Sequence, residues 1–206
     1  MDKFGYIGID EVGRGAWAGP AVIAAIFIPR DVKIPRDIII RDSKVLNRSQ
    51  RERSAAFLRE NSIFFISFVS AGTIDKYGVH RAIALGILRI CSKMKAKILA
   101  NDDISEKTYR RRYKILIDGR SVCDVSEPHE FIVHGDSTRP IISAASIIAK
   151  EYRDAYMRRV ARLYQDYGFE RHVGYGTKEH QEALGKHGVC AIHRRSYAPI
   201  RKLCTA

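Results

Sequence analysis

Cysteine is scarce in this chain, and the few cysteines do not form the spacings that metal or disulfide sites use. The sequence has 206 residues and 4 cysteines. Cys91, Cys123, Cys190 and Cys204 lie far apart, with no CxxC pair and no histidine at zinc-finger spacing. We therefore expect reduced cysteines of a cytoplasmic protein, and neither a structural zinc site nor a disulfide framework.

Long apolar runs and a leader sequence are also missing. The longest apolar segments reach only about half the length that a membrane-spanning helix requires. The first ten residues do not combine a charged start with a long apolar stretch. These absences predict a protein that is not exported and has no membrane partner.

Acidic residues are outnumbered, with 23 Asp and Glu against 36 Lys and Arg, so the formal net charge is +13. The excess is spread along the chain, and the folded body therefore carries it. A positive surface favours phosphate-rich partners such as nucleic acid, although charge alone does not exclude an anionic membrane surface. With 46% hydrophobic residues, the composition is otherwise that of a globular protein.

Apolar periodicity predicts a mixed α/β protein. Short runs rich in β-branched and aromatic residues predict five strands, at residues 4–9, 21–28, 63–69, 114–117 and 131–133. The glycine-rich segment 13–20 joins the first two strands, which we expect to pair antiparallel. Helices are predicted at residues 49–60, 74–96 (with Thr73 as N-cap) and 141–167, and a polar loop at 101–107. This order indicates a mixed sheet covered by helices.

Acidic residues follow three of the predicted strands. Asp10 and Glu11 end the first, Asp118 ends the fourth, and Asp136 comes shortly after the fifth. Taken singly, each could be an ordinary turn or capping residue. Neighbouring strand residues also point to opposite faces, which counts against a shared site for Asp10 and Glu11 unless the chain bends at Gly13. Because functional groups gather at strand ends in such sheets, we predict one cluster of four carboxylates.

A carboxylate cluster needs positive charge close by, because like charges repel and burial of a charge is costly. Hard oxygen ligands suit magnesium or manganese, whereas zinc would favour histidine or cysteine. Two such ions can activate a water molecule and stabilise a leaving oxygen. In a basic protein that attracts phosphates, this combination predicts phosphodiester hydrolysis.

The segments around these acids carry a family resemblance. Residues 8–15 are Gly-Ile-Asp-Glu-Val-Gly-Arg-Gly, residues 18–20 are Ala-Gly-Pro and residues 42–44 are Asp-Ser-Lys. Further matching segments follow in family order at 118–119, 135–136, 144–150, 174–180 and 193–196. Together they span nearly the whole chain, and the sequence closely resembles bacterial ribonuclease HII.

The resemblance implies an RNase H-like fold, in which a mixed five-stranded sheet is flanked by helices. Residues 1–206 would form a single catalytic domain, with roughly 150–206 as a C-terminal helical extension that helps to hold nucleic acid. We expect a monomer without the additional N-terminal domain of ribonuclease HIII. Residues 201–206 also lack the sliding-clamp peptide of some archaeal relatives.

The resemblance also implies an activity. The family hydrolyses RNA in RNA/DNA hybrids and incises duplex DNA on the 5′ side of an embedded ribonucleotide. We therefore expect an endonuclease that uses magnesium or manganese, as two ions, in ribonucleotide removal during replication and repair. One alternative is a non-catalytic nucleic-acid-binding protein on the same scaffold, although all four acids are retained. Another is a metal-dependent DNA nuclease or strand-transfer enzyme of this fold.

Residue by residue, the resemblance assigns the catalytic, metal-binding carboxylates to the four acids already selected. They are Asp10, Glu11, Asp118 and Asp136. The implied substrate contacts fall in three segments: a glycine loop that reads the 2′-hydroxyl largely through its main chain, a phosphate-holding pair, and a tyrosine at the RNA-to-DNA junction. These residues are Gly13, Arg14 and Gly15, then Ser43 and Lys44, then Tyr175.

Lys178 and Arg194 are weaker candidates for phosphate contacts, since bulk charge explains them almost as well. The chain departs from the family beside Asp136. His134 stands where lysine is common, and residues 137–140 (Ser-Thr-Arg-Pro) precede the long helix. These departures leave the details of substrate contact open, while the acids are unchanged.

Overall fold

Five strands form one mixed sheet in the computed structural model, which describes residues 5–204. They are β1 (Gly5–Val12), β2 (Ala21–Phe27), β3 (Ile63–Val69), β4 (Tyr113–Asp118) and β5 (His129–Ile132). The strand order is β3-β2-β1-β4-β5. Strands β1, β2 and β3 pair antiparallel, whereas β4 and β5 run parallel to β1. The predicted sheet and its antiparallel first pair are confirmed; Phe4, at the start of the first predicted strand, lies outside the described residues.

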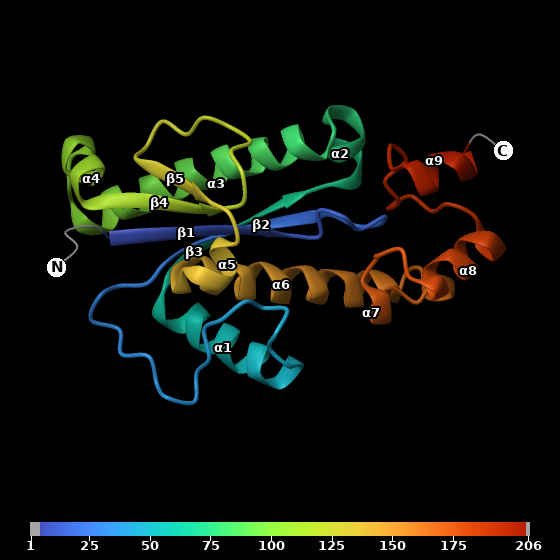
Figure 1. The fold of residues 1–206 in the computed structure, drawn as a ribbon, viewed down its shortest axis with the longest axis horizontal. Helices are drawn as coiled ribbons and strands as arrows, with labels where there is room; N and C mark the ends of the chain where they lie inside the picture. Colours follow the sequence, from blue (N-terminus) through green and yellow to red (C-terminus); the bar gives the residue numbers. More distant parts are fainter. Residues whose placement is uncertain (1–4, 205–206) are drawn as a thin grey trace.

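Helices cover both faces of the sheet (Figure 1). Helix α3 (Val79–Asp102) lies on one face, and α6 (Pro140–Ala161) and α1 (Arg48–Asn61) lie on the other. Alternating residues of the central strands serve the two cores, because successive side chains point to opposite faces. Ile7, Ile9 and Ile23 pack with α3, whereas Val22, Ala24 and Ile26 pack with α6 and α1.

The helix predictions hold in outline and fail at several boundaries. The predicted helix at 74–96 is two helices, α2 (Ala71–Tyr77) and α3, separated at Gly78. The predicted N-cap Thr73 is wrong, because Ser70 caps α2 and its Oγ accepts a hydrogen bond from the Thr73 amide. Helix α4 (Glu106–Arg112) begins inside the predicted polar loop. The third predicted helix ends at Ala161, and a separate 3-10 turn, η1, covers Gln165–Tyr167.

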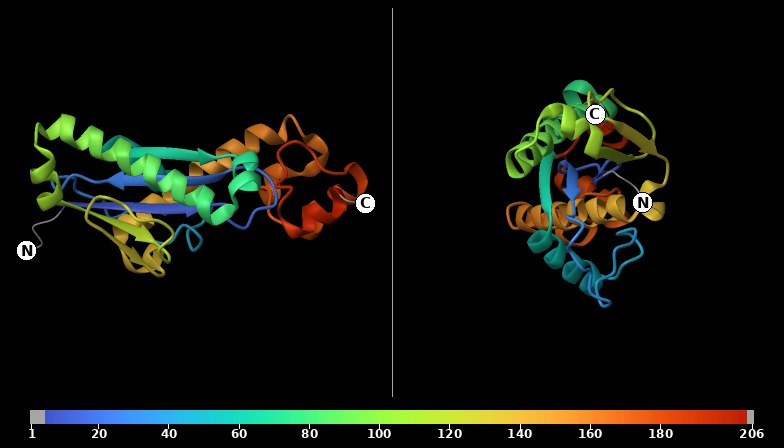
Figure 2. Two further views of the ribbon diagram at one scale, coloured as in Figure 1. Left: turned by 90° about the horizontal axis from the view of Figure 1, so that it is seen from above. Right: turned by 90° about the vertical axis from the view of Figure 1, so that its left-hand side faces the viewer.

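Short helices form the C-terminal extension. They are α7 (Phe169–His172), α8 (Lys178–His187) and α9 (Ala198–Cys204). Their apolar side chains surround the second half of α6, where Met157 and Val160 pack with Phe169, Leu184 and Ile200. Figure 2 shows these helices extending beyond one end of the sheet. Helix α6 therefore runs under the sheet with its first half and supports the extension with its second.

Over residues 5–204, none of the helices has the length and apolar character needed to span a membrane.

Candidate active site

The first element of the site is a pair of aspartates at the ends of parallel strands. Ile9 of β1 is paired with Ile117 of β4, so the next residues, Asp10 and Asp118, reach the same level at the carboxyl ends of neighbouring strands. Strand alternation turns both toward the face covered by α6, opposite to the face of Ile9 and Ile117. The register of the sheet therefore brings together two acids that are far apart in sequence.

Helix α5 (Gly135–Thr138) and the start of α6 complete this corner. The backbone amide of Asp136 donates a hydrogen bond to Asp118 Oδ1 at 3.2 Å. Helix α6 begins so close to β1 that any side chain at Gly8 would overlap the Ile141 carbonyl. Pro140 opens α6 at a position where its missing amide hydrogen costs nothing. Gly8 and Pro140 thus allow Asp136 to lie against the strand ends.

Burial and mutual repulsion disfavour the ionised form of these carboxylates when no cation is bound. Asp10 is only 4% exposed, and burial, with the neighbouring charges of Glu11 and Asp118, holds the pKa of Asp10 well above its ordinary value. Burial likewise raises the pKa of Glu11 to about 7, against an opposing effect of Arg14. The pKa of Asp118 is also raised, again chiefly by burial. The cluster therefore favours a bound proton or cation.

Lysine provides part of that compensation. Lys44 Nζ lies 2.8 Å from Asp136 Oδ2, and the pair raises the pKa of Lys44. Arg14 Nη1 lies 3.5 Å from Glu11 Oε1. Across residues 5–204, no three acidic, histidine or cysteine side chains are drawn together tightly enough to enclose a metal ion as they stand. The sheet thus gathers the four acids at one corner without closing them into a coordination shell.

A groove of about 600 Å³ adjoins the acids and contains the predicted substrate contacts except the two weaker candidates, Lys178 and Arg194. It is lined by Glu11, Val12, Gly13, Arg14, Gly15, Ser43, Lys44, Arg51, Lys150 and Tyr175. Segments from the start, the middle and the C-terminal extension of the chain therefore meet at one concave surface. A larger cavity, of about 870 Å³, is lined by Gly5, Phe27 and Tyr113 at the opposite end of the strands and contains none of the acids.

Two buried arginines hold the glycine loop, defined as residues 13–20 between β1 and β2. Arg153 of α6 donates from Nε to the Pro20 carbonyl at 3.0 Å and from Nη2 to the Ala18 carbonyl at 3.3 Å. Its guanidinium also lies 5.2 Å from the centre of the Tyr175 ring. Gly13 has φ of 88° and lies directly on Arg153, so a side chain there would be strained and would overlap it.

The second arginine corrects a prediction. Arg194 is one of the two weaker candidates for a phosphate contact, but it is fully buried. Its Nε donates to the Gly19 carbonyl at 3.0 Å, and its Nη1 donates to the Arg14 carbonyl at 2.8 Å. Arg194 therefore anchors the glycine loop from beneath and does not face solvent.

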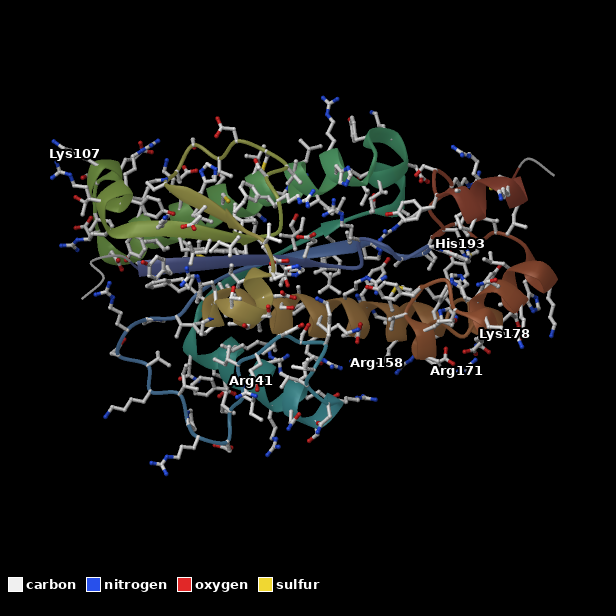
Figure 3. The ribbon with its side chains drawn as sticks, in the orientation of Figure 1. Arg41, Lys107, Arg158, Arg171, Lys178 and His193 are labelled. Carbon is white, nitrogen blue, oxygen red and sulfur yellow. The ribbon has the colours of Figure 1, made fainter. Side chains whose placement is uncertain are left out.

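The remaining predicted contacts differ in accessibility. Lys44, Arg14 and Gly15 are exposed on the groove, whereas Ser43 is buried and its Oγ lies 2.9 Å from Ser146 Oγ. Lys178 lies in α8 outside the groove lining, 3.9 Å from Glu182. Figure 3 shows Lys107 at one end of the molecule and Arg171 and Lys178 at the other, so basic side chains are not confined to the groove.

Arg153 was missed by sequence reasoning, although a signal was present. Ala149, Arg153 and Met157 follow one another at intervals of four on α6, and all three are fully buried. An arginine on the apolar stripe of a helix needs internal partners, whereas one on the opposite face needs none. The carbonyls of the glycine loop are those partners.

Comparisons with known proteins identify the family and the fold. The family model described as "Ribonuclease HII" matches residues 7–200. The ribonuclease HII of Dichelobacter nodosus is 41% identical over 197 residues, which cover 95% of each chain. The crystal structure of the ribonuclease H2 from Pyrococcus horikoshii superposes with a TM-score of 0.70 at 23% identity, and the match covers 96% of both chains.

A third similar structure is a ribonuclease HIII, Bst-RNase HIII, solved in complex with Mn²⁺. It superposes with a TM-score of 0.72 at 20% identity, and the match covers 100% of this chain and 70% of that one. At this identity the solved structures establish the RNase H-like fold, whereas the family model and the more similar sequence identify the family. The chain belongs to the ribonuclease HII family of nucleases.

Proposed function

We propose that this protein is an endonuclease that hydrolyses RNA in RNA/DNA hybrids and cuts duplex DNA on the 5′ side of an embedded ribonucleotide. The observation that carries the proposal is the junction of the carboxylate cluster with the basic, glycine-lined groove. Membership of the ribonuclease HII family supports the same substrate class. Such an enzyme would serve ribonucleotide removal in replication and repair.

We assign Asp10, Glu11, Asp118 and Asp136 as catalytic residues and metal ligands. The donor set fits Mg²⁺ or Mn²⁺, because it consists of hard carboxylate oxygens that burial and repulsion leave short of positive charge. The manganese complex of the ribonuclease HIII neighbour supports this choice. Two bound ions would supply activation of the attacking water and stabilisation of the leaving oxygen.

The groove residues would position the substrate. Gly13, Arg14 and Gly15 present main-chain groups to the 2′-hydroxyl, which is the feature that separates a ribonucleotide from its deoxy neighbours. Lys44 would hold a phosphate next to Asp136, together with Ser43 of the same segment. Tyr175 would stack on the sugar that follows the ribonucleotide.

We further propose that the whole chain acts as one catalytic domain. Its C-terminal part, roughly residues 150–206, would be the substrate-binding extension. The groove supports this division of labour, because Lys150 and Tyr175 line it together with residues of the sheet. The same division predicts that a chain lacking the extension loses substrate affinity.

The test is a cleavage map on three duplexes: all-DNA, RNA/DNA hybrid and DNA with one ribonucleotide, each with Mg²⁺, Mn²⁺ or a chelator. We expect metal-dependent cutting of the hybrid and of the singly substituted duplex, on the 5′ side of the ribonucleotide. Asp10→Asn and Asp136→Asn should abolish cutting and retain binding. Asp37→Asn, at an exposed acid outside the groove, is the matched control.

Cutting of the all-DNA duplex would instead identify a DNA nuclease. Binding to all three duplexes without cutting under any metal condition would identify a non-catalytic binding protein. Full activity of Asp10→Asn would exclude the proposed site.

A further inference from the structure

Three buried histidines lie beside the glycine loop and have no part in the function proposed above. His172, His180 and His193 are 7%, 0% and 2% exposed. They come from α7, from α8 and from the segment before α9, and Figure 3 shows His193 within the C-terminal part of the molecule. Buried imidazoles need a partner for each ring nitrogen, so their hydrogen bonds define their protonation.

The bonds of His193 and His180 form a relay with one consistent direction. The Cys190 amide donates to His193 Nδ1 at 3.0 Å, so the neutral ring carries its proton on Nε2. That nitrogen lies 2.9 Å from His180 Nε2, which must accept. His180 then carries its proton on Nδ1, which lies 3.0 Å from the Tyr175 carbonyl oxygen and donates to it. The relay therefore begins at Cys190 and ends at the Tyr175 peptide.

His172 holds the backbone of Tyr175 from the amide side. The Tyr175 amide donates to the His172 carbonyl at 2.9 Å, and the Gly174 amide donates to His172 Nδ1 at 3.2 Å. The His172 ring stacks on His180, with centroids 4.5 Å apart and planes inclined by 16°. The Tyr175 amide and carbonyl are thus both bonded to histidines, and the carbonyl also accepts from the Thr177 amide at 2.8 Å.

Neutral rings are required for this arrangement. A second proton on His180 would enter at Nε2 and set two N–H groups against each other across 2.9 Å, and a second proton on His193 would enter at Nδ1 and face the Cys190 amide at 3.0 Å. Burial lowers the pKa of His180 and of His193 to about 4, which agrees with neutral rings at physiological pH. No group of three histidine, cysteine or acidic side chains within residues 5–204 forms a metal site. Hydrogen bonds to the backbone already occupy the outward ring nitrogens of the relay.

The side chain of Tyr175 leaves this fixed peptide and faces the groove. Its ring is stacked near the Arg153 guanidinium, at 5.2 Å, while the residue lines the groove together with Gly13 and Arg14. We propose that His180 and His193 are positioning residues for junction recognition, because their relay fixes the orientation of the Tyr175 ring. This inference rests on the proposed role of Tyr175 in the function above.

The first test compares two substitutions at His180. His180→Asn keeps an amide that can donate to the Tyr175 carbonyl, whereas His180→Leu removes both ring hydrogen bonds of His180. The readout is the ratio of kcat/KM on the singly substituted duplex to kcat/KM on a continuous hybrid. We expect this ratio to fall about tenfold in His180→Leu and to stay within about threefold of wild type in His180→Asn. His187→Leu, at an exposed histidine of the same helix, should leave it unchanged.

A purely structural role would give a different pattern. It would lower both kcat/KM values equally in His180→Leu and leave their ratio unchanged, and this result would overturn the inference. In a Tyr175→Ala background, His180→Leu should have no further effect on the ratio, because the ring that the relay orients is absent. An undiminished further loss would also overturn it.

Nitrogen-15 NMR of the imidazoles tests the relay without activity. We expect neutral rings at pH 7, with the proton on Nδ1 of His180 and on Nε2 of His193. A charged ring or the opposite tautomer at either position would refute the relay. If the wild-type enzyme does not cut at a single ribonucleotide, the proposed function fails, and the NMR result still decides whether the relay exists.

Discussion

Two clusters of buried charge flank the glycine loop, and they differ in how that charge is compensated. On one side the carboxylates of Asp10, Glu11 and Asp118 repel one another, and burial raises the pKa of each. On the other side Arg153 and Arg194 donate to main-chain carbonyls of the loop. The carboxylates lack enough nearby positive charge to balance them. The two arginines instead donate hydrogen bonds to neutral atoms of the protein itself.

This difference separates a binding site from a scaffold. A cluster whose charge is not balanced gains free energy when a cation arrives. Guanidinium groups that already donate to carbonyls lose hydrogen bonds if anything moves. We infer that the carboxylate cluster binds and releases cations during function, whereas Arg153 and Arg194 hold the glycine loop in place. Substitutions on the two sides should therefore affect different measurements.

The largest effect on stability is expected at Arg194. Arg194→Met removes the guanidinium that donates to the Gly19 and Arg14 carbonyls, although the Tyr197 hydroxyl still donates to the Arg14 carbonyl. This loss should lower the free energy of unfolding by about 3 kcal/mol. Urea unfolding at pH 7 measures this, and Arg195→Met, at the exposed neighbour, should change it by less than about 0.5 kcal/mol. A stable Arg194→Met protein with weaker, less salt-sensitive binding of duplex would show that Arg194 contacts phosphate after all.

A smaller effect, dependent on pH, is expected at Glu11. Its pKa rises from 4.5 to about 7 on folding, so the folded state binds the extra proton in this window and stability falls as the pH rises through it. Without metal, wild type should lose about 2 kcal/mol relative to Glu11→Gln between pH 4.5 and pH 8. Mg²⁺ should restore most of this loss at pH 8, because the ionised carboxylate is then paired.

Comparison with Glu11→Gln is needed because the histidine relay titrates with the opposite sign. The pKa values of His180 and His193 fall from 6.5 to about 4. Their contribution is complete above pH 6.5 and is lost as the pH falls toward 4. Both proteins share this contribution, so it cancels in the difference. If the difference between wild type and Glu11→Gln is independent of pH, Glu11 is not held at a raised pKa.

The sequence predicted the carboxylate cluster far better than it predicted the contacts of the two buried arginines. Asp10 and Asp118 end apolar strands, so period-two alternation and the convergence of parallel strands were enough to bring them together. Glu11 and Asp136 followed from their neighbours and from the family resemblance. The five strands were found for the same reason, since each is a short apolar run bounded by polar residues.

The hydrogen bonds of the buried arginines join segments that are far apart in sequence, so no local sequence pattern predicts them. Arg194 bonds Gly19 and Arg14, and these contacts span 175 and 180 positions of sequence. The family resemblance made Arg194 a weak candidate for a phosphate contact, whereas the tertiary structure buries the side chain. The short helices α7, α8 and α9 escaped prediction because a few residues carry too little periodicity, and they fold by packing on Met157 and Val160.

The smallest effect is expected at Lys44, a basic side chain that is paired with Asp136. Its side chain is 75% exposed and its Nζ lies 2.8 Å from Asp136 Oδ2, so exchanging that partner for the proposed substrate phosphate should cost little. In an Asp10→Asn background, which should prevent cutting, Lys44→Met should weaken duplex binding about threefold to tenfold. It should also reduce the slope of log K against log salt by about one. Lys107→Met, at the far end of the molecule, should leave the slope unchanged. Equal slopes for Lys44→Met and its parent would mean that Lys44 only neutralises Asp136, so that the protein itself supplies part of the positive charge that the carboxylates need.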